Sequence, residues 1–222
     1  MKRIKNHIPI SPKRRPGTKA DMETITIHNT ANPTSNALGE RNWLVNPQND
    51  RTASWHIAVD DKQVVEAIPL DEVAWHAGDR VGNATSIGVE ICESGNYALA
   101  VENAAKWVAE ELIKRNWGVD RLRRHFDWSG KICPRKMFDA KTKSWAKWGA
   151  FKNQVQRTME EKRQEVDVVK LLPWQVKLAQ EAIDDLTKKG KITDPQTWKK
   201  KVEDGTIIQD MPWLFFVMLN RI

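Results

Sequence analysis

Residues 86–92 of this chain, Ser-Ile-Gly-Val-Glu-Ile-Cys, form a short run dominated by apolar and β-branched side chains. Runs of this kind are typical of a strand buried in the middle of a β-sheet. One carboxylate interrupts the run. Because side chains alternate along a strand, Glu90 should face the side opposite Val89 and Ile91. A carboxylate directed to solvent is the simple alternative, but in so apolar a strand a lone inward carboxylate needs a reason.

Strand and helix patterns alternate on either side of this run. The segments with strand periodicity are residues 22–28, 54–59 and 63–67, the last two joined as a hairpin through Asp60-Asp61-Lys62. The segments with helical periodicity are residues 33–45, closed by Asn46-Pro47, and residues 99–117, ended by Gly118. We therefore expect an α/β fold with a mixed central β-sheet flanked by helices.

The chain of 222 residues is long enough for one sizeable core and a small appendage. Residues 1–20 are basic and proline-rich and are expected to lie on the surface as an extended arm. We expect a main domain over residues 1–150, a charged linker helix over 151–166 and a small all-α domain over 167–222. Helix starts are predicted in the last domain at Pro173, Pro195 and Pro212.

The composition, 40% hydrophobic and 29% charged, is typical of a soluble globular protein. The longest apolar run near either end, residues 214–219, is far too short to span a bilayer. The basic start is not followed by an apolar stretch, so no secretory signal is expected. If its substrate lies outside the membrane, something else must release the protein.

The net charge of +7 suits a polyanionic partner, such as nucleic acid, anionic lipid or anionic cell wall. Charge alone does not choose among the three. No helix pattern combines a basic face with the base-reading side chains of a known DNA-binding motif, which ranks nucleic acid last.

Three residues have the chemistry of zinc ligands. His125 and Cys133 lie eight positions apart with Gly130 between them for a turn, and His28 ends the first predicted strand. Imidazole nitrogen and thiolate sulfur are preferred zinc ligands, and two histidines with one cysteine leave a tetrahedral position open for water. Taken singly, Cys133 is more often a small buried side chain, and His28 a hydrogen-bonded residue at a strand end.

Five segments place the chain beside a known family. In order they read ITIHNT, SWHIAVDD, AWHAGD, SIGVEIC and HFDWSGKICP. Together they resemble the zinc amidases of N-acetylmuramoyl-L-alanine amidase type, a group that includes phage endolysins and the peptidoglycan recognition proteins. The match runs over roughly residues 20–140. It looks closest to phage and prophage lysins of Gram-positive hosts, which pair such a domain with a small C-terminal wall-binding unit.

The resemblance implies a peptidoglycan hydrolase that uses one zinc ion to cleave the amide bond between N-acetylmuramic acid and L-alanine. It implies that His28, His125 and Cys133 bind the zinc. Lys131 matches a lysine that helps to stabilise the oxyanion, although a solvated loop lysine is the default without the motif. Glu90 matches the acidic residue that many bacterial members place beside the zinc-bound water. The alternative is a non-catalytic peptidoglycan-binding module, but such relatives typically lose the cysteine ligand.

Two positions depart from the family pattern. Some members carry a tyrosine before the histidine of the second strand, where this chain has Trp55. Because an indole cannot transfer a proton, the burden of proton transfer shifts to Glu90. Arg135 stands where the family often has glycine, for which we expect a local loop difference without lost activity.

Further residues are expected around the zinc. Trp75 and His76 belong to a segment that resembles a groove-lining part of the family, and with Asn29 they are expected to bind substrate. His56 and Asp127 are expected to support the zinc ligands through hydrogen bonds. For these two residues a plain structural role stays open.

The expectation that the C-terminal domain binds the cell wall rests on analogy with the domain arrangement of such lysins. Trp174, Trp198 and Trp213 could form an aromatic patch for wall polymer, or the core of a small helical bundle. The lysines at 188–189 and 199–201 could meet anionic wall polymers, or be solvated. We expect peptidoglycan, and through this domain anionic wall polymers, as partners, and neither nucleic acid nor membrane.

Overall fold

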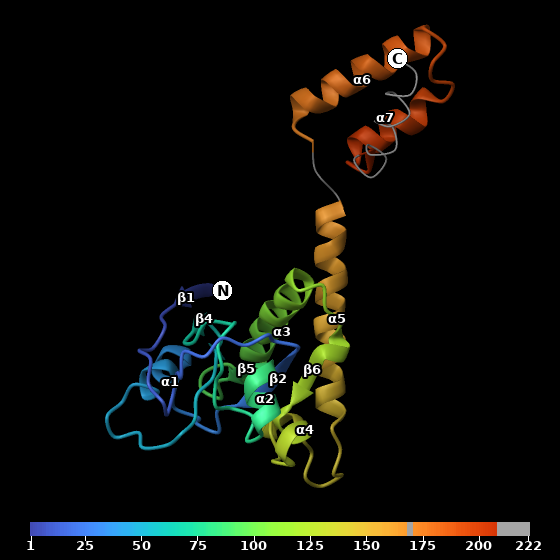
Figure 1. Cartoon of the computed structure of the whole chain (residues 1–222). Coiled ribbons are helices and arrows are strands. Elements are labelled where there is room, and N and C mark those ends of the chain that lie inside the picture. The colour runs from blue at the N-terminus through green and yellow to red at the C-terminus, as the bar shows by residue number, and fades with distance from the viewer. Residues whose placement is uncertain (168–170, 208–222) are drawn as a thin grey trace. The chain divides into compact units, whose positions relative to one another are not determined.

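The structure, a computed structural model, describes residues 1–167 and 171–207 (Figure 1). The chain divides into two units, Met1–Met159 and Glu160–Ile222. The first unit is built on a six-stranded sheet with the order β1-β4-β3-β5-β2-β6. The strands are β1 (Lys2–Lys5), β2 (Thr24–Asn29), β3 (Ile57–Val59), β4 (Gln63–Glu66), β5 (Ser86–Ile91) and β6 (Leu122–Arg124). β3 and β4 form the expected antiparallel hairpin and the other four pairs are parallel, so the predicted mixed sheet is confirmed.

Helices flank this sheet. In the first unit they are α1 (Ala37–Trp43), α2 (Arg80–Thr85), α3 (Tyr97–Lys114) and α4 (His125–Ser129), with short 3-10 turns at Val119–Arg121 and Arg135–Met137. The helix α5 (Ala146–Asp167) begins in the first unit and continues past its boundary at Met159. The described part of the second unit holds α6 (Pro173–Lys188) and α7 (Pro195–Glu203). Within the described ranges, no helix combines the length and apolar character that a membrane crossing needs.

The main core lies on one face of the sheet. Every second residue of the central strands belongs to it, such as Ile25 and Ile27 in β2 and Val89 in β5. Apolar residues of α3 and α5, which lie side by side in Figure 1, close this face. The same alternation turns Thr26 and His28, and Gly88 and Glu90, to the other face of the sheet. The period-two pattern thus places the apolar core residues on one face of the sheet and His28 and Glu90 on the other.

The opposite face carries a smaller apolar cluster under α1. Ala37 of α1, Ala58 of β3, Val65 of β4 and Cys92 are fully buried there. Ala58 is paired in register with Glu90, and His28 with the same glutamate across the next strand. The carboxyl ends of β2 and β5 therefore lie beside this cluster, which places His28 and Glu90 on neighbouring strands.

Two sequence expectations for the first unit need correction. Residues 1–20 are not only a surface arm: Lys2–Lys5 pair in parallel with β4 as an edge strand, and Ile8 is buried. A strand of four residues with three charges gives no hydrophobic signal. The helix α3 ends at Lys114, and Asn116, with φ of 55°, takes the left-handed conformation expected of Gly118.

The segment over residues 151–166, expected to be a linker helix, is divided between the two units. Phe151, Val155 and Met159 of α5 are buried in the main core, so the first half of this segment belongs to the first unit. These three side chains are four residues apart and form an apolar stripe that the many charges around them obscure.

In the second unit, α6 begins at Pro173 and α7 at Pro195, as expected. Asp194 accepts a hydrogen bond from the Thr197 backbone N–H at 3.2 Å and caps α7. The expected third helix at Pro212, and with it Trp213, lies outside the described residues.

Candidate metal centre and active site

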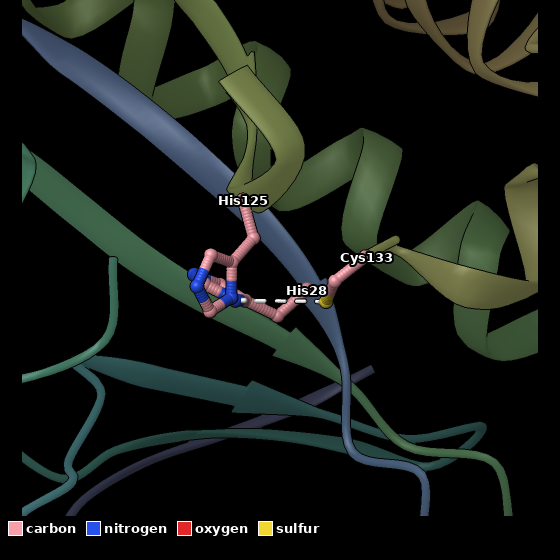
Figure 2. A group of neighbouring side chains, drawn as sticks. All are labelled: His28, His125 and Cys133. Carbon is pink, nitrogen blue, oxygen red and sulfur yellow. Dashed lines mark hydrogen bonds between the residues drawn. The ribbon is translucent and has the colours of Figure 1, made fainter. Parts of the chain in front are cut away.

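Three donor atoms from distant parts of the chain meet beyond the end of β2. His28 stands near the end of that strand, His125 opens α4, and Cys133 lies in the loop before the turn at Arg135–Met137. Nδ1 of His28 is 3.0 Å from Nδ1 of His125 and 3.8 Å from Sγ of Cys133. Figure 2 shows the three side chains lying close together. Among the described residues, this is the one convergence of His, Cys, Asp or Glu side chains that could hold a metal ion.

The spacing of the three donors fits a tetrahedral zinc ion. With bond lengths of about 2.0–2.1 Å to nitrogen and about 2.3 Å to sulfur, two nitrogen ligands lie about 3.3 Å apart, and nitrogen and sulfur about 3.6 Å. The observed 3.0 Å and 3.8 Å bracket these values. Three donors fill three corners of a tetrahedron and leave the fourth for water or substrate.

The hydrogen bonds around His28 fix which of its nitrogens is free. The Ser86 carbonyl can only accept, so Nε2 of His76, 2.8 Å away, carries a proton and Nδ1 of His76 does not. Nε2 of His28, 3.0 Å from that Nδ1, must then be the donor. In the neutral ring, Nδ1 of His28 is left with its lone pair directed at His125 and Cys133, as metal binding requires.

Burial keeps these rings neutral. It lowers the pKa of His28 well below its usual value, with His76 and His125 as further causes. Burial, with Lys131 as a smaller cause, lowers the pKa of His125 to about 4. Nδ1 of His28 directs its lone pair at Nδ1 of His125, 3.0 Å away, and with His125 also neutral a cation between the two nitrogens could be bound by both, so the donor set fits a metal.

The protonation state of the Cys133 thiol is controlled differently from that of the histidines. Burial, together with Glu90, raises its pKa to about 12, so the sulfur is protonated when no cation is near. The backbone at Asn29 and Arg135, together with Lys131, acts in the opposite direction and lowers the pKa of the thiol, which favours the thiolate. A bound divalent cation deprotonates a coordinating thiol outright.

Glu90 lies on β5 at the position that pairs with His28. Its Oε2 is buried and has no hydrogen-bond partner. Burial, with Glu40 as the next cause, raises the pKa of Glu90 to about 8, whereas Lys131 opposes this shift. A buried carboxyl group without a partner is costly, and such groups cluster at functional sites. The sequence did not point to Glu40, whose buried carboxylate enters through α1.

A groove of about 720 Å³ contains all of these groups. His28, His125, Cys133 and Glu90 line it together with the exposed Lys131. Its other lining residues include three tryptophans, two arginines and polar residues from the loops after β2 and α1, namely Trp43, Trp55, Trp75, Arg51, Arg135, Asn29, Thr30 and Asn32. Aromatic faces beside a few polar groups are typical of sites for carbohydrate and peptide ligands.

Not every expected site residue faces this groove with a free polar group. Both ring nitrogens of the buried His76 are used, by His28 and by the Ser86 carbonyl, so they are not available to a substrate. Asn29 is 6% exposed, and its side chain accepts the Lys136 backbone N–H at 3.0 Å and donates to Tyr97 Oη at 3.1 Å. Both residues therefore brace the ligands. Trp75 lines the groove and donates Nε1–H to the Pro12 carbonyl at 2.9 Å.

His56 and Asp127, the two residues expected to support the ligands, make no direct hydrogen bond to the ligand side chains and contact residues next to them. His56 is fully buried, with Nε2 2.7 Å from the Glu72 carbonyl and Nδ1 accepting the Gly88 N–H at 2.9 Å. Its ring packs edge-on against His76, with ring centroids 5.7 Å apart. Asp127 accepts the Arg124 backbone N–H at 2.7 Å and pairs with the Arg124 guanidinium, which holds the start of α4.

Comparison with known proteins shows the family of the chain. A family model described as N-acetylmuramoyl-L-alanine amidase matches residues 18–136, the stretch that contains all three donors. The chain belongs to the N-acetylmuramoyl-L-alanine amidase family. Over 122 residues it is 49% identical to the amidase CwlA of Bacillus subtilis, which covers 52% of this chain and 44% of CwlA. To the amidase XlyA of the same organism it is 40% identical over 156 residues, which covers 67% of this chain and 49% of XlyA.

Two solved structures share the fold of this chain. The catalytic domain of XlyA shares 38% identity with a TM-score of 0.63 and covers 70% of this chain and 99% of that domain. The structure of PlyL shares 35% identity with a TM-score of 0.60 and covers 70% of this chain and 98% of PlyL. The chain spans about half the length of the curated amidases it matches.

Proposed function

We propose that this chain is a zinc-dependent amidase that hydrolyses the bond between N-acetylmuramic acid and L-alanine in peptidoglycan. The observation that carries the proposal is the convergence of His28, His125 and Cys133 on one wall of a groove that also holds Glu90 and Lys131. Three donors with an open fourth position are typical of catalytic rather than structural zinc sites.

His28, His125 and Cys133 would hold the zinc ion. When bound, zinc supplies a Lewis acid for the amide carbonyl and lowers the pKa of water to about 7. Glu90 would accept a proton from the attacking water and return it to the nitrogen of L-alanine as that group leaves. Lys131, which has no ion pair among the described residues, would stabilise the negative charge that develops on the carbonyl oxygen.

Glu90 is suited to proton transfer by its surroundings. Burial raises the pKa of its carboxyl group, whereas a cation held by the three donors would favour the carboxylate form that accepts a proton. Its Oε2 has no competing hydrogen bond. No tyrosine is available at Trp55 to share this role, and the Trp55 indole N–H is itself buried without a partner. We therefore assign the proton transfer to Glu90 alone.

For the second unit we propose binding to the cell wall, including anionic wall polymers. Trp174 is 60% exposed on α6, and Lys201 lies over the ring of Trp198, 5.2 Å from its centroid. Lys199 pairs with Asp184 at 2.6 Å, so not every lysine of this unit is free for a polyanion. With such a unit the chain would act as a phage or prophage endolysin that stays in the host cytoplasm until it is released.

The test is the release of new amino termini from purified peptidoglycan, with and without a chelator, followed by addition of zinc. N-terminal alanine should appear only in the presence of metal. Lys131→Ala should lower the rate by about 100- to 1000-fold, as expected for loss of an oxyanion donor. Lys141→Ala, which removes an exposed lysine outside the groove, should leave the rate unchanged. Binding to the wall without release of any amine would instead support a non-catalytic binding module.

A further inference from the structure

A buried carboxylate stands beyond the end of β5 and is not part of the chemistry proposed above. The side chain of Glu93 is 1% exposed. Its Oε1 accepts the Ala31 backbone N–H at 3.1 Å and Nε of Arg135 at 2.8 Å. Its Oε2 accepts a second bond from the Arg135 guanidinium. One carboxylate thus joins two loops, and both loops line the groove.

The two partners of Glu93 belong to the segments that carry metal donors. Ala31 follows His28 by three residues, and Arg135 follows Cys133 by two. The Arg135–Glu93 ion pair therefore anchors the Cys133 loop close to its sulfur donor.

His28 and Cys133 need such a connection because their supports differ. His28 sits in a strand with neighbours on both sides in the sheet. Cys133 sits in a loop, where its neighbours in sequence are not held by a ladder. Beside Glu93, the tie across this gap is Asn29, which accepts the Lys136 N–H at 3.0 Å. The Arg135–Glu93 bond is charge-assisted and bidentate, which fixes direction as well as distance.

We propose that Glu93 is a positioning residue for the metal centre: through Arg135 and Ala31 it holds the Cys133 loop at ligand distance from His28. This proposal rests on the metal role proposed above for His28, His125 and Cys133. Partners behind metal ligands commonly change metal affinity by about 10- to 100-fold when they are removed. Glu93→Ala should weaken zinc binding by that amount, although no atom of Glu93 touches the metal.

The same contacts could merely stabilise the fold, so the test needs a matched control. Glu111 on α3 lies in the same unit, and as whole residues Glu93 and Glu111 are both 7% exposed. Glu111 pairs with Arg115 at 2.5 Å. It lies outside the groove. Glu111→Ala removes a comparable ion pair and should lower the thermal unfolding midpoint without changing zinc affinity.

The experiment measures the zinc dissociation constant of the full chain by competition with a chromophoric chelator. It also records the thiolate-to-metal absorption of the cobalt-substituted protein, and the unfolding midpoint without metal. The variants are Glu93→Ala, Glu93→Gln, Arg135→Gln and Glu111→Ala. Glu93→Gln keeps an acceptor for Ala31 but loses the charge, so its affinity should fall between those of the parent and Glu93→Ala. Arg135→Gln should match Glu93→Gln, and the cobalt absorption should change in all three.

Each outcome decides a separate point. If Glu93→Ala and Arg135→Gln bind zinc as the parent does, the ion pair is only structural and the proposal is overturned. If Glu93→Ala does not fold, the same comparison is made with Glu93→Gln and with Arg135→Gln, because the Arg135 side chain is half-exposed. If the parent binds no zinc, the metal assignment fails first and the positioning role with it. If zinc binding follows the prediction but no amide is cleaved, the positioning role stands and the proposed enzyme activity does not.

Discussion

Gly88 offers the sharpest test of how the metal centre is supported, because it lies in β5 directly against the ring of His76. A Cβ atom at Gly88 would stand 2.6 Å from Cγ, 2.8 Å from Cδ2 and 2.9 Å from Nδ1 of His76. Carbon atoms prefer separations of about 3.5–4.0 Å, so Gly88→Ala creates an overlap of about 1 Å. We expect this substitution to disturb a zinc ligand without changing any ligand.

Neither side of this contact can give way freely. The backbone of Gly88 donates to Nδ1 of His56 at 2.9 Å and accepts the His56 N–H at 3.1 Å. The ring of His76 is held between the Ser86 carbonyl and Nε2 of His28. A shift of the ring must therefore lengthen one of these two bonds. Overpacking of this kind costs about 1–3 kcal/mol of unfolding free energy.

The effect on metal follows from the bond to His28. If His76 moves, Nε2 of His28 loses its acceptor and the ring is no longer held in orientation, which typically weakens metal binding by about 10- to 100-fold. Urea unfolding of the metal-free protein and zinc competition with a chelator measure the two effects. Gly149→Ala is the control: a Cβ there meets nothing within 4 Å, and alanine in a helix is favoured by up to about 1 kcal/mol. If Gly88→Ala matches the parent in both assays, His76 does not support His28.

Four further predictions test other parts of the site and fold. Cys133→Ser should change the unfolding free energy of the metal-free protein by less than about 1.5 kcal/mol but abolish tight zinc binding in a competition assay, because a hydroxyl is a poor zinc ligand. Glu90→Gln should retain zinc yet release amino termini from peptidoglycan about 100- to 10,000-fold more slowly, and an undiminished rate would remove Glu90 from the mechanism. Phe151→Ala should cost about 3–5 kcal/mol in urea unfolding, whereas a residue in a true linker would cost almost nothing. Metal-free protein should lose stability as the pH falls from about 6.5 to about 4. Burial lowers the pKa of His56 to about 4, so the unfolded chain binds a proton at a higher pH than the folded chain does. The free energy of unfolding should fall by up to about 1.4 kcal/mol per pH unit for each such histidine. Equal urea midpoints at pH 7 and pH 5 would contradict it.

The period-two pattern carries much of the fold and part of the site. It places Ile25, Ile27 and Val89 in the core and turns His28 and Glu90 to the other face, as the sequence predicts. It says nothing about β6, which has three residues, or about β1, whose charged residues pair at the sheet edge. Strands this short are set by the neighbours they pair with, and those neighbours are far away in sequence.

The roles of residues around the ligands were harder to predict for a different reason. His76 and Asn29 carry polar groups that suit a substrate as well as they suit a neighbouring side chain. Only the distances to Ser86, His28 and Lys136 show that these groups are already occupied. Residue type and spacing do not encode which partner a polar group finds, because that depends on how segments that are separate in the chain pack against one another.

The arrangement of the ligands explains why so many buried polar contacts surround them. One ligand lies on a strand, but His125 opens a helix of five residues and Cys133 lies in a loop, and neither element is stable by itself. The helix is tied to the sheet by Trp128, which donates Nε1–H to Oγ1 of Thr26 at 2.8 Å, and to the loop by the Phe126 N–H, which donates to the Cys133 carbonyl at 3.1 Å. These hydrogen bonds hold the short helix and the loop in place, because neither element is stable by itself. Loss of a tie should therefore appear first in metal affinity, where an error of a few tenths of an ångström matters, and only later in the stability of the fold.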